Sequence, residues 1–95
     1  MYQILDTICI NATVRERVAA SITPPDEGLW AILAPEQTTD VMPPSPGQKA
    51  TIARPDGDVL QVRIDGAEVK HGVLGILFKS LGRDDVPRLS EIDWH

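Results

Sequence analysis

Short apolar runs alternate with turns over the second half of the chain, from Gly47 to Trp94. The clearest run is 59–64, which reads VLQVRI, so that every second residue after Val59 is apolar. That period of two places apolar side chains on one face of a β-strand and polar side chains on the other. We predict a strand here with one face in the core and the other in water.

A second strand is predicted at 50–54, because the turn sequence Pro55-Asp56-Gly57-Asp58 separates it from the strand at 59–64. An Asp-Gly pair between two apolar runs is typical of a β-hairpin, since it supplies the positive φ angles that a tight turn requires. The two strands are therefore expected to pair in antiparallel fashion.

Two further strands are expected at 73–81 and 91–94. The first carries apolar residues on both parities and has Gly75 in its middle, where a glycine often marks a bulge or a bend. The predicted core consists of Leu60, Val62, Ile64, Leu74, Ile76, Phe78 and Ile92.

The first nine residues after Met1 also favour a strand, in which Ile4, Ile8 and Ile10 share one parity. Cys9 lies between two of these isoleucines, which favours a buried and inert thiol. A single cysteine cannot form an intramolecular disulfide or a cysteine metal cluster, and a reducing compartment is the simplest context for it. We therefore expect a cytoplasmic protein.

The segments 11–22 and 23–46 are harder to interpret. Val14, Val18 and Ile22 recur at helical spacing, whereas 18–22 also alternates as a strand would. The segment 23–46 is rich in proline but encloses the apolar run Gly28–Ala34. That run is expected to form a short strand or helical turn closing one end of the fold, or else to expose Trp30 to a partner.

Several stretches carry a resemblance to a known family. They are GQKATIARPDG at 47–57, IDGAE at 64–68, VLGILF at 73–78, DDVPR at 84–88 and SEI at 90–92. Together they resemble the second domain of translational GTPases such as elongation factor Tu, and DTICI at 6–10 is similar to the first strand of that domain. The resemblance favours a strand at 18–22.

That resemblance implies a noncatalytic Greek-key β-barrel, which in the family contacts the small ribosomal subunit, aminoacyl-tRNA or the enzyme's own GTPase domain. The chain departs from the family in two ways. No glycine precedes Gly28, and 23–46 is much longer than the connection the family uses. We thus expect one all-β domain over 1–95, a closed or nearly closed barrel of about six antiparallel strands with a long proline-rich insertion at 23–46.

Composition limits the possible partners. The chain has 95 residues, 14 acidic and 9 basic, with a net charge of −5, which weighs against nonspecific DNA binding. No run approaches the roughly 18 apolar residues of a membrane span, and no secretory signal pattern is present at the start. We expect no membrane association.

Candidate chemistry is sparse, so we expect no enzyme, no cofactor and no metal. The segment Pro46–Thr51 lacks the spacing and the second glycine of a P-loop. His71 occupies a turn sequence, and no motif places a nucleophile or metal ligands beside it. Asp84 and Asp85 are typical of a turn whose carboxylates accept backbone N–H groups.

The sequence therefore predicts a binding module whose target is a protein or a ribonucleoprotein, with the acidic balance favouring a protein. Two alternatives stay open: a homodimer formed through the Gly28–Ala34 segment, and a small-molecule binder at the barrel mouth. The candidate contact residues are Leu29 and Trp30 for a protein, and His71, Lys79, Arg83 and Arg88 for RNA.

Overall fold

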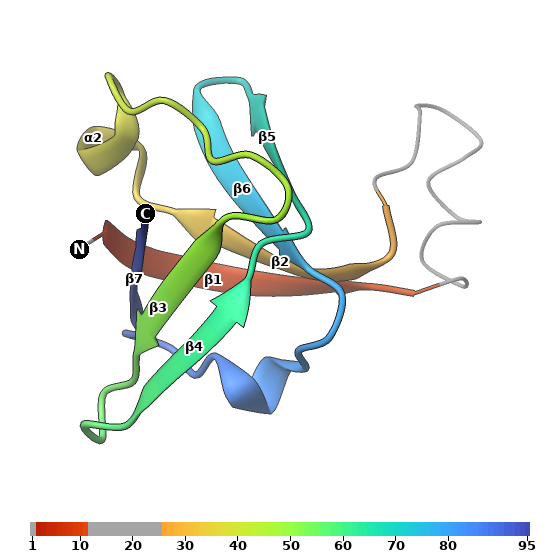
Figure 1. The fold of residues 1–95 in the computed structure, drawn as a ribbon. Helices are drawn as coiled ribbons and strands as arrows, with labels where there is room; N and C mark the ends of the chain where they lie inside the picture. Colours follow the sequence, from red (N-terminus) through yellow and green to blue (C-terminus); the bar gives the residue numbers. More distant parts are fainter. Residues whose placement is uncertain (1, 12–25) are drawn as a thin grey trace.

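Seven antiparallel strands form one sheet in the computed structural model, which describes residues 2–11 and 26–95 (Figure 1). The prediction of an all-β chain is confirmed. The helical elements of the described part are a one-turn helix, α2 (Pro35–Thr38), and a 3-10 turn, η1 (Arg83–Asp85). The strands are β1 (Tyr2–Ile10), β2 (Gly28–Leu33), β3 (Lys49–Ala53), β4 (Val59–Arg63), β5 (Gly66–Lys70), β6 (Val73–Phe78) and β7 (Glu91–Trp94).

The sheet is open rather than closed. Its order is β4-β3-β7-β1-β2-β6-β5, so β4 and β5 lie at the two edges, and the predicted closed barrel of about six strands is not what the pairing shows. The reason lies between β4 and β5. The Ile64 N–H donates to the Gln48 carbonyl at 2.8 Å, and the next N–H, that of Asp65, donates to the Leu77 carbonyl at 2.9 Å. The chain therefore changes partner strand at this point.

The predicted hairpin is confirmed, with β3 and β4 paired from Lys49 and Arg63 to Ala53 and Val59. Its turn differs in detail from the prediction, because only Gly57 has a positive φ, of 97°. Asp56 contributes through its side chain instead, since Oδ1 accepts the Asp58 N–H at 2.9 Å. This local hydrogen bond is the usual role of aspartate in a turn.

A bulge in β1 divides the isoleucines that were predicted to share one face. The pairing of β1 with β2 shifts register between Ile4 and Asp6. Ile4 pairs with Leu33 on the core side, whereas Ile8 pairs with Trp30 on the opposite side and is 45% exposed. An extra residue in one strand reverses the parity of all that follow.

The expectation that Cys9 is buried is wrong, because its side chain is exposed. We predict that native protein reacts with Ellman's reagent at one thiol within minutes, at a rate close to that of the urea-unfolded chain. A native rate slower by about a hundredfold or more would contradict the exposed position of Cys9.

The proline-rich segment is not one long loop. Its apolar run forms β2, which lies inside the sheet with β1 on one side and β6 on the other. The strand was expected to close one end of the fold, yet pairing on both sides is what buries Leu29, Ala31 and Leu33 completely. The predicted strand at 18–22, its helical alternative and residues 23–25 lie outside the described residues.

The core lies between the two halves of the bent sheet. Of the predicted core, Ile64, Leu74, Ile76, Phe78 and Ile92 are buried, and Leu60 and Val62 are partly buried against them. Side chains from β1, β2 and β3 complete the core, as does Val86 after η1. At its margin Trp94 stacks on Tyr2 with ring centroids 4.9 Å apart, so the last strand packs against the first.

Candidate functional site

An apolar surface lies on the outer face of β1 and β2. Successive residues of a strand point to opposite faces, so Trp30 and Ile32 face away from the core that Leu29 and Leu33 enter. Ile8 stands beside Trp30 on the neighbouring strand. We call Ile8, Trp30 and Ile32 the Trp30 surface.

The Trp30 ring is held flat against the sheet. Its indole Nε1–H donates to the Asp26 carbonyl at 2.9 Å. On the other side the ring covers Gly75 of β6, where a Cβ atom would lie 3.3 Å from Trp30 Cε3 and 3.5 Å from Ile32 Cδ1. The glycine thus leaves room for the ring, whose remaining surface is partly exposed to solvent.

Carboxylates flank the Trp30 surface on both sides. Cross-strand pairing sets Asp6 beside Ile32, Ile32 beside Gly75, and Gly75 beside Glu68. These four residues therefore form a row across four strands on the outer face, and its two ends are acidic and exposed. The apolar surface is bordered by negative charge at the β1 side and at the β5 side.

The other predicted contact residues are distributed over the molecule. Leu29 is completely buried, so its side chain is not available to a partner, and that part of the prediction is corrected. His71 is in the turn before β6 and Lys79 follows the end of β6, so the length of that strand separates them. Arg83 is on η1, at the bottom of Figure 1, and its Nη2 donates to the Thr7 carbonyl at 3.3 Å. Arg88 is exposed in the turn before β7.

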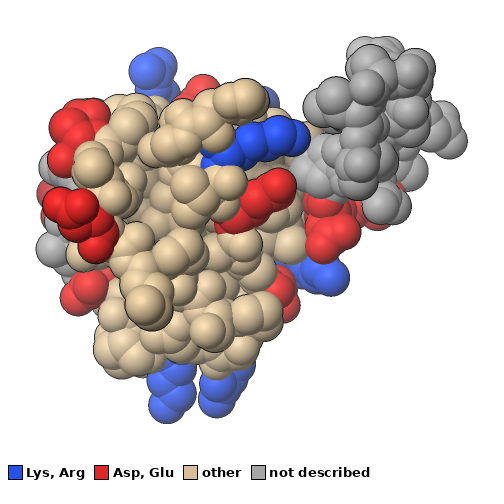
Figure 2. Space-filling view, turned by 90° about the horizontal axis from the view of Figure 1, so that it is seen from above, with Lys and Arg blue, Asp and Glu red and all other residues tan. Residues whose placement is uncertain are grey.

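The turn between β5 and β6 and the loop after α2 lie at the top of Figure 1 and so face the viewer in Figure 2. Uncharged side chains cover most of this face. Met42, in the loop after α2, is 84% exposed. Lys and Arg side chains do not gather into one large patch here.

Asp85 has the turn role expected from the sequence. Its Oδ2 accepts the Gly82 N–H at 2.7 Å, and its Oδ1 lies 3.8 Å from Arg54 Nη2. Arg54 Nε also donates to the Asp85 carbonyl at 2.9 Å. These contacts fasten η1 to the base of the β3–β4 hairpin.

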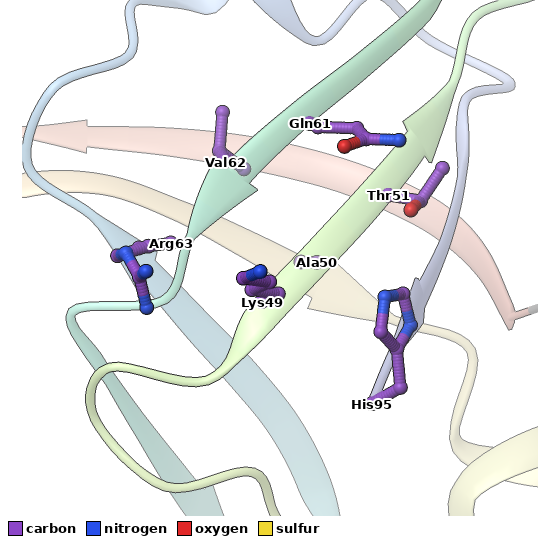
Figure 3. A pocket seen from close by; sticks show the side chains of 7 residues that line it. All are labelled: Lys49, Ala50, Thr51, Gln61, Val62, Arg63 and His95. Atoms are coloured by element: carbon purple, nitrogen blue, oxygen red, sulfur yellow. The ribbon is translucent and has the colours of Figure 1, made fainter.

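A shallow depression of about 280 Å³ lies on the outer face of β3 and β4, and no sequence motif pointed to it (Figure 3). Its polar lining consists of Lys49, Thr51, Gln61, Arg63 and His95. Lys49 and Arg63 are direct cross-strand partners, and the His95 N–H donates to the Lys49 carbonyl at 3.1 Å. Lys49 accordingly lies between the other two in Figure 3. Like charges placed directly opposite on two strands destabilise the pair by up to about 1 kcal/mol.

Comparison with known proteins gives no relative: no family model, no curated protein and no solved structure matches the chain. In residues 2–11 and 26–95, no three side chains of His, Cys, Asp or Glu are grouped so that they could hold a metal ion. No helix within the same residues is long and apolar enough to cross a membrane.

Proposed function

We propose that the chain is a noncatalytic module that binds a protein partner through the Trp30 surface. The observation that carries the proposal is a partly exposed tryptophan on the outer face of the sheet with the exposed Ile8 beside it. Large aromatic side chains in such positions supply much of the binding energy at protein interfaces. The sequence resemblance to the second domain of translational GTPases, a noncatalytic binding domain, is a second ground for the proposal.

The flanking charges indicate the chemistry of the partner. Asp6 and Glu68 border the apolar surface, so the complementary partner presents apolar side chains with Lys or Arg on either side. A second copy of the chain fits less well. In a symmetric dimer the same surface meets itself, which brings the acidic ends of one copy against those of the other.

A protein partner is favoured over a ribonucleoprotein because His71, before β6, lies apart from Lys79 and Arg83, which follow that strand. A nucleic-acid contact depends on several cations that reach neighbouring phosphates. The β5–β6 turn, which holds His71, is at the top of Figure 1, and η1, which holds Arg83, is near the bottom. The whole chain carries a net charge of −5.

Replacement of Trp30 tests the proposal. The purified chain serves as bait in the nuclease-treated and untreated halves of one bacterial lysate, beside Trp30→Ala and a charge-reversed double variant, Asp6→Lys with Glu68→Lys. We expect one protein that the unmodified bait retains, with a Kd at least about thirtyfold weaker for Trp30→Ala, since an interface tryptophan contributes about 2 kcal/mol or more. The double variant is expected to bind more weakly at low salt, and added salt is expected to strengthen its binding because it screens the new repulsion between like charges.

Val59→Ala is the matched control, because Val59 is 61% exposed on β4, away from the Trp30 surface. All variants are checked by their melting temperatures, which separates loss of contact from loss of fold. Retention that survives Trp30→Ala, or that disappears after nuclease treatment, would refute the proposal. The second outcome would favour the ribonucleoprotein.

A further inference from the structure

Two basic side chains share one cross-strand position on the outer face of β3 and β4. The register pairs Lys49 with Arg63 directly, so both side chains leave the sheet on the same side. The row continues toward β7, where His95 is bonded through its backbone N–H to the Lys49 carbonyl. Three strands thus bring a lysine, an arginine and a histidine to one depression (Figure 3).

No carboxylate among the described residues balances this pair. Across the described ranges the one ion pair closer than 4 Å is that of Arg54 with Asp85, at the other end of the hairpin. Asp93 is an acid on the same face, and it pairs with Thr51 in the next row toward β7. Its Oδ1 accepts the Trp94 N–H at 3.1 Å. The side of the depression that borders β4 is therefore left positive in a chain whose net charge is −5.

Neutral donors complete the lining. Thr51 and Gln61 are cross-strand partners in the row beside the basic pair, and both contribute to the depression. Arg63 is oriented by one hydrogen bond, from Nη1 to the Gly47 carbonyl at 2.9 Å. The other guanidinium N–H groups remain for a ligand, and a guanidinium matches the geometry of carboxylate and phosphate oxygens.

From these positions we propose that the depression is a binding site for an oxyanion, namely a phosphate or carboxylate group, held by Arg63 and Lys49 with Thr51 and Gln61 as neutral donors. A volume of about 280 Å³ suits a small anion or the charged end of a larger molecule. The anion offsets the repulsion between the paired cations. The site is separate from the Trp30 surface, which lies on β1 and β2, so neither proposal depends on the other.

The test is a titration of the ¹⁵N-labelled chain, followed by amide chemical shifts. Sodium phosphate and sodium acetate are added in separate arms at pH 7, and sodium chloride at matched ionic strength is the reference. We expect saturable shifts, with half-saturation in the millimolar range, at the amides of 49–51, 61–63 and His95. Saturation with only one of the two anions would assign the oxyanion class.

Arg63→Gln and Lys49→Gln are each expected to weaken the saturable binding at least about tenfold, because each removes a charged donor. The control Lys70→Gln removes one positive charge at the end of β5 and is expected to leave the binding unchanged. In the absence of phosphate, Lys49→Gln is also expected to melt at a higher temperature than the unmodified chain, since it relieves the repulsion with Arg63.

Shifts that grow linearly and are equal in phosphate, acetate and chloride would overturn the proposal, because they report ionic screening alone. Saturable binding that Arg63→Gln leaves unchanged would overturn it as well. The amide spectrum of each variant shows whether it is folded, so loss of binding is not confused with loss of structure.

Discussion

Phe78→Ala is expected to lower the free energy of unfolding by about 3–5 kcal/mol, the cost of removing a large aromatic side chain from a core. Phe78 is completely buried at the end of β6 and pairs with Leu29 of β2, which is buried as well. Loss of the ring leaves a cavity between the central strands, where both neighbours are fixed by pairing and cannot move in to fill it. Urea unfolding followed by circular dichroism measures the change.

The control for Phe78→Ala is Val59→Ala, at an exposed position of an edge strand. It is expected to change the unfolding free energy by no more than about 0.5 kcal/mol. A cost below about 1 kcal/mol for Phe78→Ala would contradict its place in the core.

Gly28→Ala is expected to cost roughly 2–5 kcal/mol, because backbone strain and crowding add. Gly28 begins β2 with a φ of 141°, which side chains rarely adopt. An added Cβ would lie 2.7 Å from Leu77 Cδ1 and 3.2 Å from the carbonyl oxygen of Phe78. The leucine tip can move, but the backbone oxygen belongs to the paired strand β6 and cannot.

Gly47→Ala separates the two contributions. Gly47 has a φ of 90°, and no atom lies within 4 Å of the position that an added Cβ would occupy. This variant therefore reports backbone strain alone, about 1–3 kcal/mol. Equal costs for Gly28→Ala and Gly47→Ala would show that the contact of β2 with β6 is looser than these distances indicate.

Local patterns predicted the elements that depend on neighbouring residues. The β3–β4 hairpin follows from alternation and a turn sequence, and the strand β6 follows from a short apolar run; both signals act over a few residues. The place of β2 in the sheet does not, because its partners β1 and β6 are remote in sequence. The bulge after Ile4 also escaped prediction, and with it the exposure of Ile8. The exposure of Cys9 does not follow from the bulge, because Cys9 pairs with the buried Leu29.

The candidate contact residues also divide into those that local patterns could predict and those that depend on strands remote in sequence. Trp30 is partly exposed, as the partner-binding interpretation of the Gly28–Ala34 segment required. Leu29 was predicted to contact the same partner, although adjacent residues of a strand point to opposite faces of the sheet. The alternation rule could have separated them once a strand was assumed. Lys49 and Arg63 were also within reach of the sequence, because the hairpin turn sets their pairing. His95 was not, since its contact with Lys49 needs the placement of β7 beside β3.

The Trp30 surface and the oxyanion site lie on different parts of the sheet and carry opposite charge at their borders. On the proposed function, a partner with basic residues beside its apolar contact would be attracted by Asp6 and Glu68 and repelled by Lys49 and Arg63. The two proposals together therefore predict one preferred orientation of the partner.

The most direct test of the central claim maps the contact on the chain itself. The partner retained by the bait is purified and added to the ¹⁵N-labelled chain, and amide intensities are followed as the complex forms. The proposed function predicts that the largest losses fall at Ile8, at 28–33 and at 73–78, around the Trp30 surface. Losses centred on η1 and Arg88, with 28–33 unchanged, would contradict it.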